Sequence, residues 1–176
     1  MSTTELTAEH VPALQRFFET LPEGDTTFIK EDLSPEVLGT WTDPGRRGNR
    51  WLEFDEQGRV LGFVALLPLR GWSSHVGELR LVVHPDARGQ GVGRRLAQLA
   101  LREATGMALT KLIVEVVAAQ QGLIAMFNAL GFSAEALLED HIRDRTGQLQ
   151  DIVLLAHTVD ENWSAMAVTG VDAALI

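Results

Sequence analysis

The chain has 176 residues, 45% of them hydrophobic, which predicts one globular domain with a sizeable core. It contains no cysteine, which excludes disulfides, thiolate catalysis and cysteine-bound zinc. The net charge of −9 argues against a broad nucleic-acid-binding surface, because phosphate contacts need clustered Lys and Arg. No stretch approaches the ~20 apolar residues of a membrane span, and the start carries no leader pattern. We therefore expect a cytoplasmic protein with neither nucleic-acid nor membrane partners.

The first quarter of the chain predicts a strand, two helices and two loops. A short strand is expected over residues 3–6, and residues 11–21 have apolar side chains at helical spacing. Residues 22–33 are polar and acidic, which predicts a loop. The Ser-Pro-Glu sequence at 34–36 predicts a helix start, with a hydroxyl cap and a proline in the first turn. The three arginines of residues 46–50 are typical of a solvated loop.

The middle of the chain predicts an antiparallel hairpin followed by a third strand and a helix. Residues 51–55 and 59–69 are strand-like, and Gly58 between them suits the positive φ of a bulged hairpin. The second of these strands is almost continuously apolar, which indicates burial on both faces. A further strand over residues 76–83 precedes a helix over residues 91–103.

The last third predicts a strand over residues 110–117, a helix over residues 120–130, and a closing hairpin. The hairpin pairs residues 134–143 with residues 149–159. This order of elements indicates an α/β fold built around one mixed sheet.

The chain end divides into a folded part and a tail. We expect residues 1–159 to form a single domain and residues 160–176 to form a C-terminal tail. Unusually for a tail, the segment is apolar after its first acids. Apolar surface marks interfaces, so an extra strand, a subunit contact in a homodimer, or a frayed terminus are the alternatives.

A glycine-rich turn lies between the strand over residues 76–83 and the next helix. Gly89, Gly91 and Gly93 allow positive φ and close approach of a ligand to the backbone. The helix start offers unpaired N–H groups and partial positive charge. This order of strand, turn and helix predicts an anion site for a diphosphate. Three arginines add positive charge: Arg88, Arg94 and Arg95.

Two other nucleotide-binding patterns fail on spacing. A dinucleotide fingerprint would put its third glycine on Arg94 or Leu96, and a Walker A loop would need Gly-Lys-Ser/Thr. The remaining alternative is a surface turn that is rich in glycine.

The segment Arg88–Gly93 fits the pattern Arg/Gln-x-x-Gly-x-Gly/Ala. Together with the preceding residues Val82–Pro85, this segment resembles the acetyl-CoA-binding motif of the GNAT N-acyltransferases. The resemblance implies a single, mostly antiparallel sheet of about six to seven strands flanked by about four helices. It also implies acetyl-CoA as cosubstrate and a bulge near Leu81–Val83 that turns N–H groups toward the thioester. The implied cofactor-binding residues are Leu81, Val82, Val83, Arg88, Gly89, Gln90, Gly91, Val92, Gly93 and Arg94.

A second segment, Gln120–Phe132, resembles the family's Asn-x-x-Ala-x-x-x-Tyr-x-x-x-Gly-Phe stretch. The resemblance adds Gln120 and Phe127 to the cofactor-binding residues. Gln120 replaces the usual asparagine, and Phe127 replaces the tyrosine that frequently protonates the leaving thiolate. Since the chain has no tyrosine, either another group donates that proton or the thiolate leaves unprotonated.

Acetyl transfer to an amine requires a base, because a lysine-like ammonium has a pKa of about 10.4. Glu78 is the first candidate, since its offset from Arg88 resembles that of the proposed base in the phosphinothricin-type branch. A salt bridge to Arg80 is the alternative for Glu78. His84 and Glu115 are further candidates; His84 is otherwise a turn histidine, and Glu115 is a carboxylate in a buried strand.

The acceptor is expected to be a small primary amine or an amino-acid-like molecule. Phe28, Trp41 and Trp72, with the acids of residues 23–32, suit a cationic amine, and residues 147–153 resemble the phosphinothricin-type branch. The five histidines show no metal-binding spacing, so no metal is expected. The alternative function is a non-catalytic acyl-CoA-binding module of the same fold.

Overall fold

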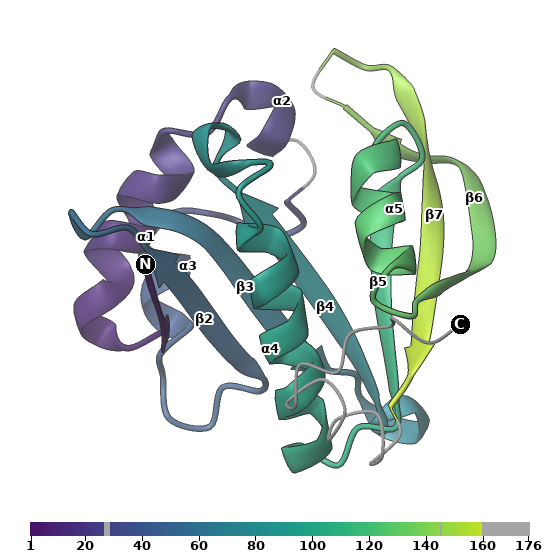
Figure 1. Cartoon of the computed structure of the whole chain (residues 1–176), viewed down its shortest axis with the longest axis horizontal. Coiled ribbons are helices and arrows are strands. Elements are labelled where there is room, and N and C mark those ends of the chain that lie inside the picture. The colour runs from purple at the N-terminus through teal and green to yellow at the C-terminus, as the bar shows by residue number, and fades with distance from the viewer. Residues whose placement is uncertain (27–28, 145, 160–176) are drawn as a thin grey trace.

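A central sheet of seven strands organises the molecule, and helices cover both of its faces (Figure 1). The computed structural model describes residues 1–26, 29–144 and 146–159. The strands are β1 (Ser2–Glu5), β2 (Asn49–Phe54), β3 (Val60–Pro68), β4 (Val76–Val83), β5 (Lys111–Val117), β6 (Ser133–Arg143) and β7 (Leu149–Thr158). The α-helices are α1 (Val11–Glu19), α2 (Glu23–Thr26), α3 (Pro35–Thr40), α4 (Val92–Gly106) and α5 (Gln121–Asn128).

The strand order is β1-β2-β3-β4-β5-β7-β6, and the pairs are antiparallel except for β4 and β5. The predicted mixed, mostly antiparallel sheet is therefore confirmed. The predicted strand over residues 76–83 has the same bounds in the structure, and α4 extends three residues beyond the predicted end at residue 103. None of the helices in the described ranges is long and apolar enough to cross a membrane.

Two hydrophobic cores sandwich the first half of the sheet, and β3 contributes to both. Val64 and Leu66 pack beneath α4 and α5, whereas Phe63 and Ala65 pack against α1 and α3. Alternating residues of a strand point to opposite faces, so both faces of β3 are buried as predicted.

The sheet divides where β4 meets β5. Parallel pairing joins Val76–Glu78 to Lys111–Ile113 and extends no further among the described residues. Beyond Glu78 the two strands diverge, and Figure 1 shows α4 over one side of the gap and α5 over the other. The divergence leaves a wedge-shaped space in the middle of the sheet.

Three predictions about the first quarter of the chain are wrong in detail. The expected loop over residues 22–33 contains the short helix α2, whose first turn carries two acids. Ser34 precedes α3, but its hydroxyl makes no capping hydrogen bond. Arg50 lies in β2 rather than in a solvated loop, is 4% exposed, and places its guanidinium 5.2 Å from the Trp41 ring centroid. Stacking on an aromatic ring allows this arginine to be buried.

The predicted tail, residues 160–176, lies outside the described residues.

Candidate active site

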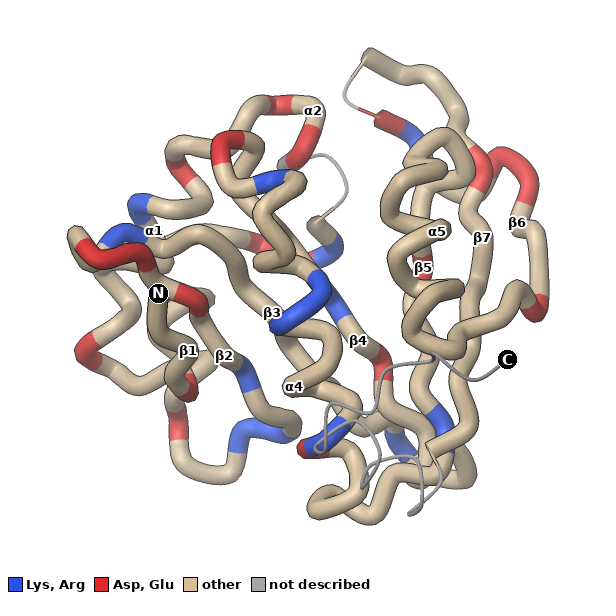
Figure 2. Tube along the Cα trace, viewed as in Figure 1, with Lys and Arg blue, Asp and Glu red and all other residues tan. Residues whose placement is uncertain are grey.

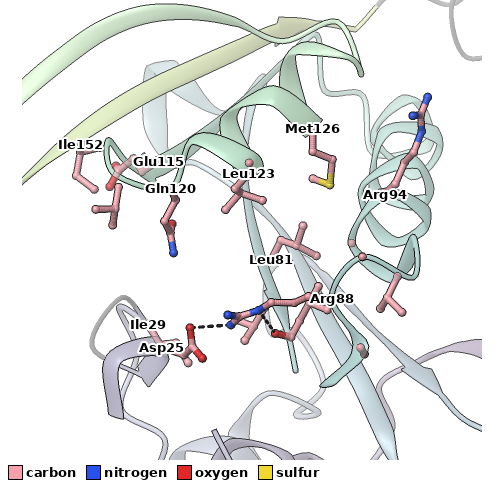
Figure 3. Close-up of a pocket in the computed structure, with 18 of the residues that line it drawn as sticks. Asp25, Ile29, Leu81, Arg88, Arg94, Glu115, Gln120, Leu123, Met126 and Ile152 are labelled. Atoms are coloured by element: carbon pink, nitrogen blue, oxygen red, sulfur yellow. Dashed lines mark hydrogen bonds and ion pairs between the residues drawn. The ribbon is translucent and has the colours of Figure 1, made fainter. Parts of the chain in front are cut away.

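A cavity of about 860 Å³ fills the space between the diverging strands (Figure 3). Its size falls within the range of about 300–1,000 Å³ that is usual for ligand pockets. At one end it reaches the glycine-rich turn and the start of α4, and at the other it reaches Lys30 and Glu115. A smaller cavity of about 80 Å³ adjoins this second end and is lined by Lys30, Glu78 and Glu115, among others.

The glycine-rich turn forms an open cradle of backbone N–H groups. Gly89 and Gly91 have φ of +74° and +77°, a conformation that favours glycine. The first intrahelical bond of α4 runs from the Arg95 N–H to the Gly91 C=O, so the preceding N–H groups have no intrahelical partner. A Cβ on Gly93 would lie 3.3 Å from a Val83 methyl group. The turn therefore has the backbone geometry that an anion site requires, and anion binding here stays a prediction.

The arginines near the cradle have different partners. Arg88 and Arg94 line the cavity, and Figure 3 shows Arg94 pointing away from Arg88. An Arg88 Nη2 lies 2.7 Å from Asp25 Oδ1 of α2, which ties this helix to the turn. Arg95 instead donates through Nε to Glu53 of β2 at 3.0 Å. Its Nη1 also donates to the Gln90 carbonyl of the turn at 3.0 Å, so the Arg95 guanidinium lies beside the cradle as predicted, with Glu53 balancing its charge.

The predicted bulge of β4 is absent from its pairing with β3, which runs in unbroken register from Pro68–Gly77 to Gly62–Val83. Free N–H groups arise in another way. The His84 N–H donates to Leu61 of β3, and alternation along the strand turns Leu81 and Val83 toward β5. Since β5 has diverged there, the backbone groups of Leu81 and Val83 face the cavity that their side chains also line. Val82 lines the cavity as well.

Three charged side chains meet at the inner end of the cavity. The Lys30 ammonium lies 2.7 Å from Glu115 Oε2 and 2.8 Å from Glu78 Oε1. Glu78 also accepts a hydrogen bond from Arg80 at 2.9 Å, and Arg80 forms a further ion pair with Glu31. Figure 2 shows charged residues of both signs on β4 and β5, near the middle of the sheet.

The ion pairs shift the pKa values of Lys30 and Glu78 in opposite directions. Burial would raise the pKa of Glu78, but hydrogen bonds from Arg80 and Lys30 outweigh burial and lower it. Burial would likewise lower the pKa of Lys30, but its bonds to Glu115 and Glu78 raise it. At neutral pH the ammonium and the Glu78 carboxylate are therefore both charged.

The three predicted base candidates occupy different places. Glu115 lines both cavities and Glu78 lines the smaller one. His84 lies in the turn after β4, where its Nδ1 accepts from the Asp86 N–H at 3.3 Å. Its ring packs near Phe17, with centroids 6.3 Å apart, and lines neither cavity.

The remaining predicted cofactor residues differ in exposure to the cavity. Gln120 points into it with Leu123 and Met126 of α5 (Figure 3), and Val92 lines it from α4. Gln90 instead donates to the Asp86 carbonyl at 2.7 Å and lies outside the lining. The Phe127 ring is fully buried, 5.1 Å from that of Phe132, and borders the smaller cavity.

His141 is a cavity residue that the sequence reasoning missed. It comes from β6, where the register to β7 shifts between Leu138 and Ile142. Asp140 in this irregularity has φ of +50°, and its N–H donates to the Asp151 carboxylate at 2.9 Å. The alternating sequence around His141 gives no local signal for such a shift.

The two tryptophans expected at the acceptor site lie elsewhere. Trp41 is buried in the core beneath α1 and α3, and Trp72 is 97% exposed on the turn between β3 and β4. Phe28 lies outside the described residues. Within the described ranges, no group of three or more His, Asp or Glu side chains could hold a metal ion.

Comparison with known proteins identifies relatives of this chain. Residues 13–132 match the family model described as Acetyltransferase (GNAT) family. A curated protein named Uncharacterized N-acetyltransferase YjgM, from Escherichia coli (strain K12), is 30% identical over 98 residues, which cover 55% of this chain and 57% of that protein. Mycothiol acetyltransferase of Arthrobacter sp. (strain FB24) is 27% identical over 107 residues, 59% of this chain and 32% of that protein. The matches thus span between about a third and just over half of these two relatives.

Solved structures share the fold over most of the chain. A ribosomal-protein-alanine N-acetyltransferase from Brucella melitensis superposes with a TM-score of 0.76 at 23% identity, covering 90% of this chain and 99% of that one. A phosphinothricin acetyltransferase from Sinorhizobium meliloti, in complex with AcCoA, gives a TM-score of 0.77 at 21% identity, covering 91% and 89%.

Proposed function

Because this chain belongs to the acetyltransferase (GNAT) family, we propose that it transfers an acetyl group from acetyl-CoA to a primary amine. The observation that carries the proposal is that one cavity of about 860 Å³ joins the glycine cradle to the carboxylate of Glu115. One end of the cavity offers anion-binding N–H groups, and the other offers a carboxylate beside an ammonium. Acetyl-CoA needs both ends, because its diphosphate requires anion-binding groups and its thioester must meet an amine beside a base.

The cradle would bind the diphosphate. Its N–H donors lie at the positive end of α4, a helix of 15 residues. The pantetheine arm would run from the cradle into the gap between β4 and β5. There the backbone groups of Leu81 and Val83 would hold the arm and donate to the oxyanion that forms on the thioester carbonyl.

Glu78 and Glu115 would receive the amine. A protonated amine costs roughly 4–5 kcal/mol to deprotonate at pH 7, since each pKa unit is worth about 1.4 kcal/mol. We assign the base to Glu115, because it lines both cavities and has one ion-pair partner, Lys30, among the described residues. Glu78 would position the ammonium, since both of its oxygens already accept hydrogen bonds from cations. This reverses the order predicted from the sequence.

The reaction then needs no hydroxyl at Phe127. The amine nitrogen attacks the thioester carbon, and the carbon–sulfur bond of the tetrahedral intermediate breaks. A thiol has a pKa of about 8.5, so its thiolate is an adequate leaving group at neutral pH. The proton held by Glu115 can reach the thiolate through water, and the nitrogen loses its remaining extra proton to water as the amide forms.

A non-catalytic acyl-CoA-binding module is the second candidate. The buried phenyl ring of Phe127 favours it, because no proton donor stands where the resemblance places a tyrosine.

A thiol-release assay separates the two functions. The protein is mixed with acetyl-CoA and, in turn, with polyamines, amino acids, aminoglycosides and peptides, and free CoA is followed by a thiol reagent. Amine-dependent release supports the enzyme. Thermal stabilisation by acetyl-CoA without release on any amine supports the module. Calorimetry that finds no affinity for acetyl-CoA contradicts both.

A further inference from the structure

Lys30 places a primary amine inside the candidate active site. Its ammonium contacts Glu115 and Glu78 at 2.7 and 2.8 Å, and its side chain is 43% exposed. Lys30 lines the larger cavity together with the glycine cradle, and it lines the smaller cavity with Glu78. The amine therefore lies where the two cavities adjoin.

The position meets the requirements for an acetyl acceptor. A nucleophilic amine must lie within the site that holds the thioester, and a carboxylate must be within hydrogen-bond reach to remove its proton. Lys30 satisfies both, since each of its carboxylate contacts is shorter than about 3.2 Å. Its ammonium occupies the place that an external substrate ammonium would take between the same two carboxylates.

The second lysine of the chain provides an internal contrast. The sequence contains two lysines, Lys30 and Lys111. Lys111 lies at the start of β5, where its ammonium contacts both oxygens of Glu135 at 2.7 Å. It lines neither of the two cavities. Both amines are partly exposed and paired with carboxylates, so the difference between them is the cavity.

We propose that Lys30 is acetylated by the site that contains it, with acetyl-CoA as the donor. The proposal rests on the proposed function, because it needs acetyl-CoA in the cavity. It adds to that function a covalent modification at one defined side chain. The acceptor in this reaction is part of the chain, so no external amine is required.

The step balances as an acyl transfer. Lys30 passes one proton from its ammonium to Glu115, and the neutral nitrogen attacks the thioester carbon. A carbon–nitrogen bond forms, the carbon–sulfur bond breaks, and the nitrogen loses a second proton, so that one of the two protons reaches the departing thiolate and the other passes from Glu115 to water. The products are Nε-acetyl-lysine and CoA thiol. No oxidant or reductant takes part.

The modification would change the charge of the site. Acetyl-lysine is neutral and cannot form ion pairs with Glu115 and Glu78. Arg80 remains as a cationic partner of Glu78, whereas Glu115 loses the cation that the structure places on it. An external ammonium would then meet an unpaired carboxylate.

Mass spectrometry of the full chain tests the proposal. The starting mass is measured first, acetyl-CoA is then added without any amine, and acetylated peptides are mapped over time. We expect one acetyl group on Lys30, with Lys111 labelled about a hundredfold more slowly, because positioning alone provides effects of this size. The rate constant should not depend on protein concentration, since the reaction occurs within one chain.

Matched variants complete the test. Lys30→Arg keeps the charge and should abolish the labelling, whereas Lys111→Arg should label Lys30 as the wild type does. Equal labelling of both lysines, or the same labelling of heat-unfolded chain, would indicate chemical acetylation and overturn the proposal.

An assay with an external amine separates this proposal from the proposed function. Thiol release with an external amine while Lys30 stays unmodified overturns self-acetylation alone. The absence of both labelling and acetyl-CoA binding overturns the proposed function as well.

Discussion

Glu53 of β2 and Glu78 of β4 are both buried carboxylates, 1% and 9% exposed, and each is bound by an arginine. Glu53 joins β2 to α4 through Arg95 and is enclosed by the sheet and the helix. Glu78 joins β4 to Lys30 and lines a cavity next to Glu115. Burial and an ion pair are therefore shared by a structural position and a candidate catalytic one. Only the neighbouring cavity and the primary amine distinguish them.

The largest expected effect comes from Glu115, the base in the proposed reaction. Glu115→Gln should lower kcat for amine acetylation about a hundredfold or more, because the amide cannot accept the proton, and should leave the affinity for acetyl-CoA near that of the wild type. Steady-state kinetics and calorimetry measure the two quantities. Glu78→Gln is the matched comparison and should mainly raise KM. A kcat of Glu115→Gln within a few-fold of the wild type would contradict the assignment.

Substitution of Glu53 should lower the stability of the fold rather than kcat. Glu53→Gln removes the charge that holds Arg95 against β2, and we expect a loss of about 1–3 kcal/mol in the free energy of unfolding. Because the Arg95 side chain is 44% exposed, water can solvate the freed guanidinium, which keeps the loss below the roughly 3–5 kcal/mol of a fully buried pair. Denaturant titration measures it. A fall in kcat at full stability would instead place Glu53 in the site.

The sequence predicted the glycine cradle better than the cluster of Lys30, Glu78 and Glu115. The cradle is built from residues adjacent in the chain, whereas the cluster is built from residues far apart in it. Strand, proline turn and glycines are adjacent in the chain, and Gly89 and Gly91 have the positive φ that their residue type suggested. Lys30 and Glu78 are 48 residues apart in the sequence, and only the tertiary fold brings Lys30 against β4. No local pattern reports such a contact.

The same distinction explains the error at β4. A bulge would be a local irregularity within one strand, and the resemblance implied one near Leu81–Val83. The free backbone groups arise instead from the divergence of β5, which depends on how two distant segments pair. The contact of these backbone groups with a thioester stays a prediction, now based on the divergence of β5 rather than on a bulge.

A smaller effect is expected at Lys30. Lys30→Gln resembles the acetylated side chain and removes the ammonium that competes with an external amine for Glu115. We expect KM for a cationic amine to fall about three- to tenfold, which corresponds to one lost ion-pair contact. Lys111→Gln should leave KM unchanged. A higher KM in Lys30→Gln would show that the ammonium helps to bind the acceptor.

The smallest expected effect is the contribution of the Glu78 carboxylate to the pH dependence of the free energy of unfolding. The pKa of Glu78 is lowered from its ordinary value of 4.5, because hydrogen bonds from Arg80 and Lys30 outweigh burial. A carboxylate whose pKa is lower in the folded chain than in the unfolded chain stabilises the fold above the ordinary pKa. That stabilisation is lost as the pH falls from 4.5 through the lowered value.

Unfolding free energies at several pH values measure this contribution in the wild type and in Glu78→Gln. The wild type should lose more stability than the variant as the pH falls below about 4.5, since the amide has no proton to bind; a pKa difference of one corresponds to about 1.4 kcal/mol. At neutral pH the ion pairs are complete in the wild type, so the stability difference between the two proteins should be largest there. Parallel curves for the two proteins would mean that Arg80 and Lys30 stabilise the folded chain equally well with a neutral side chain. In that case the charge of Glu78 would serve the acceptor rather than the fold.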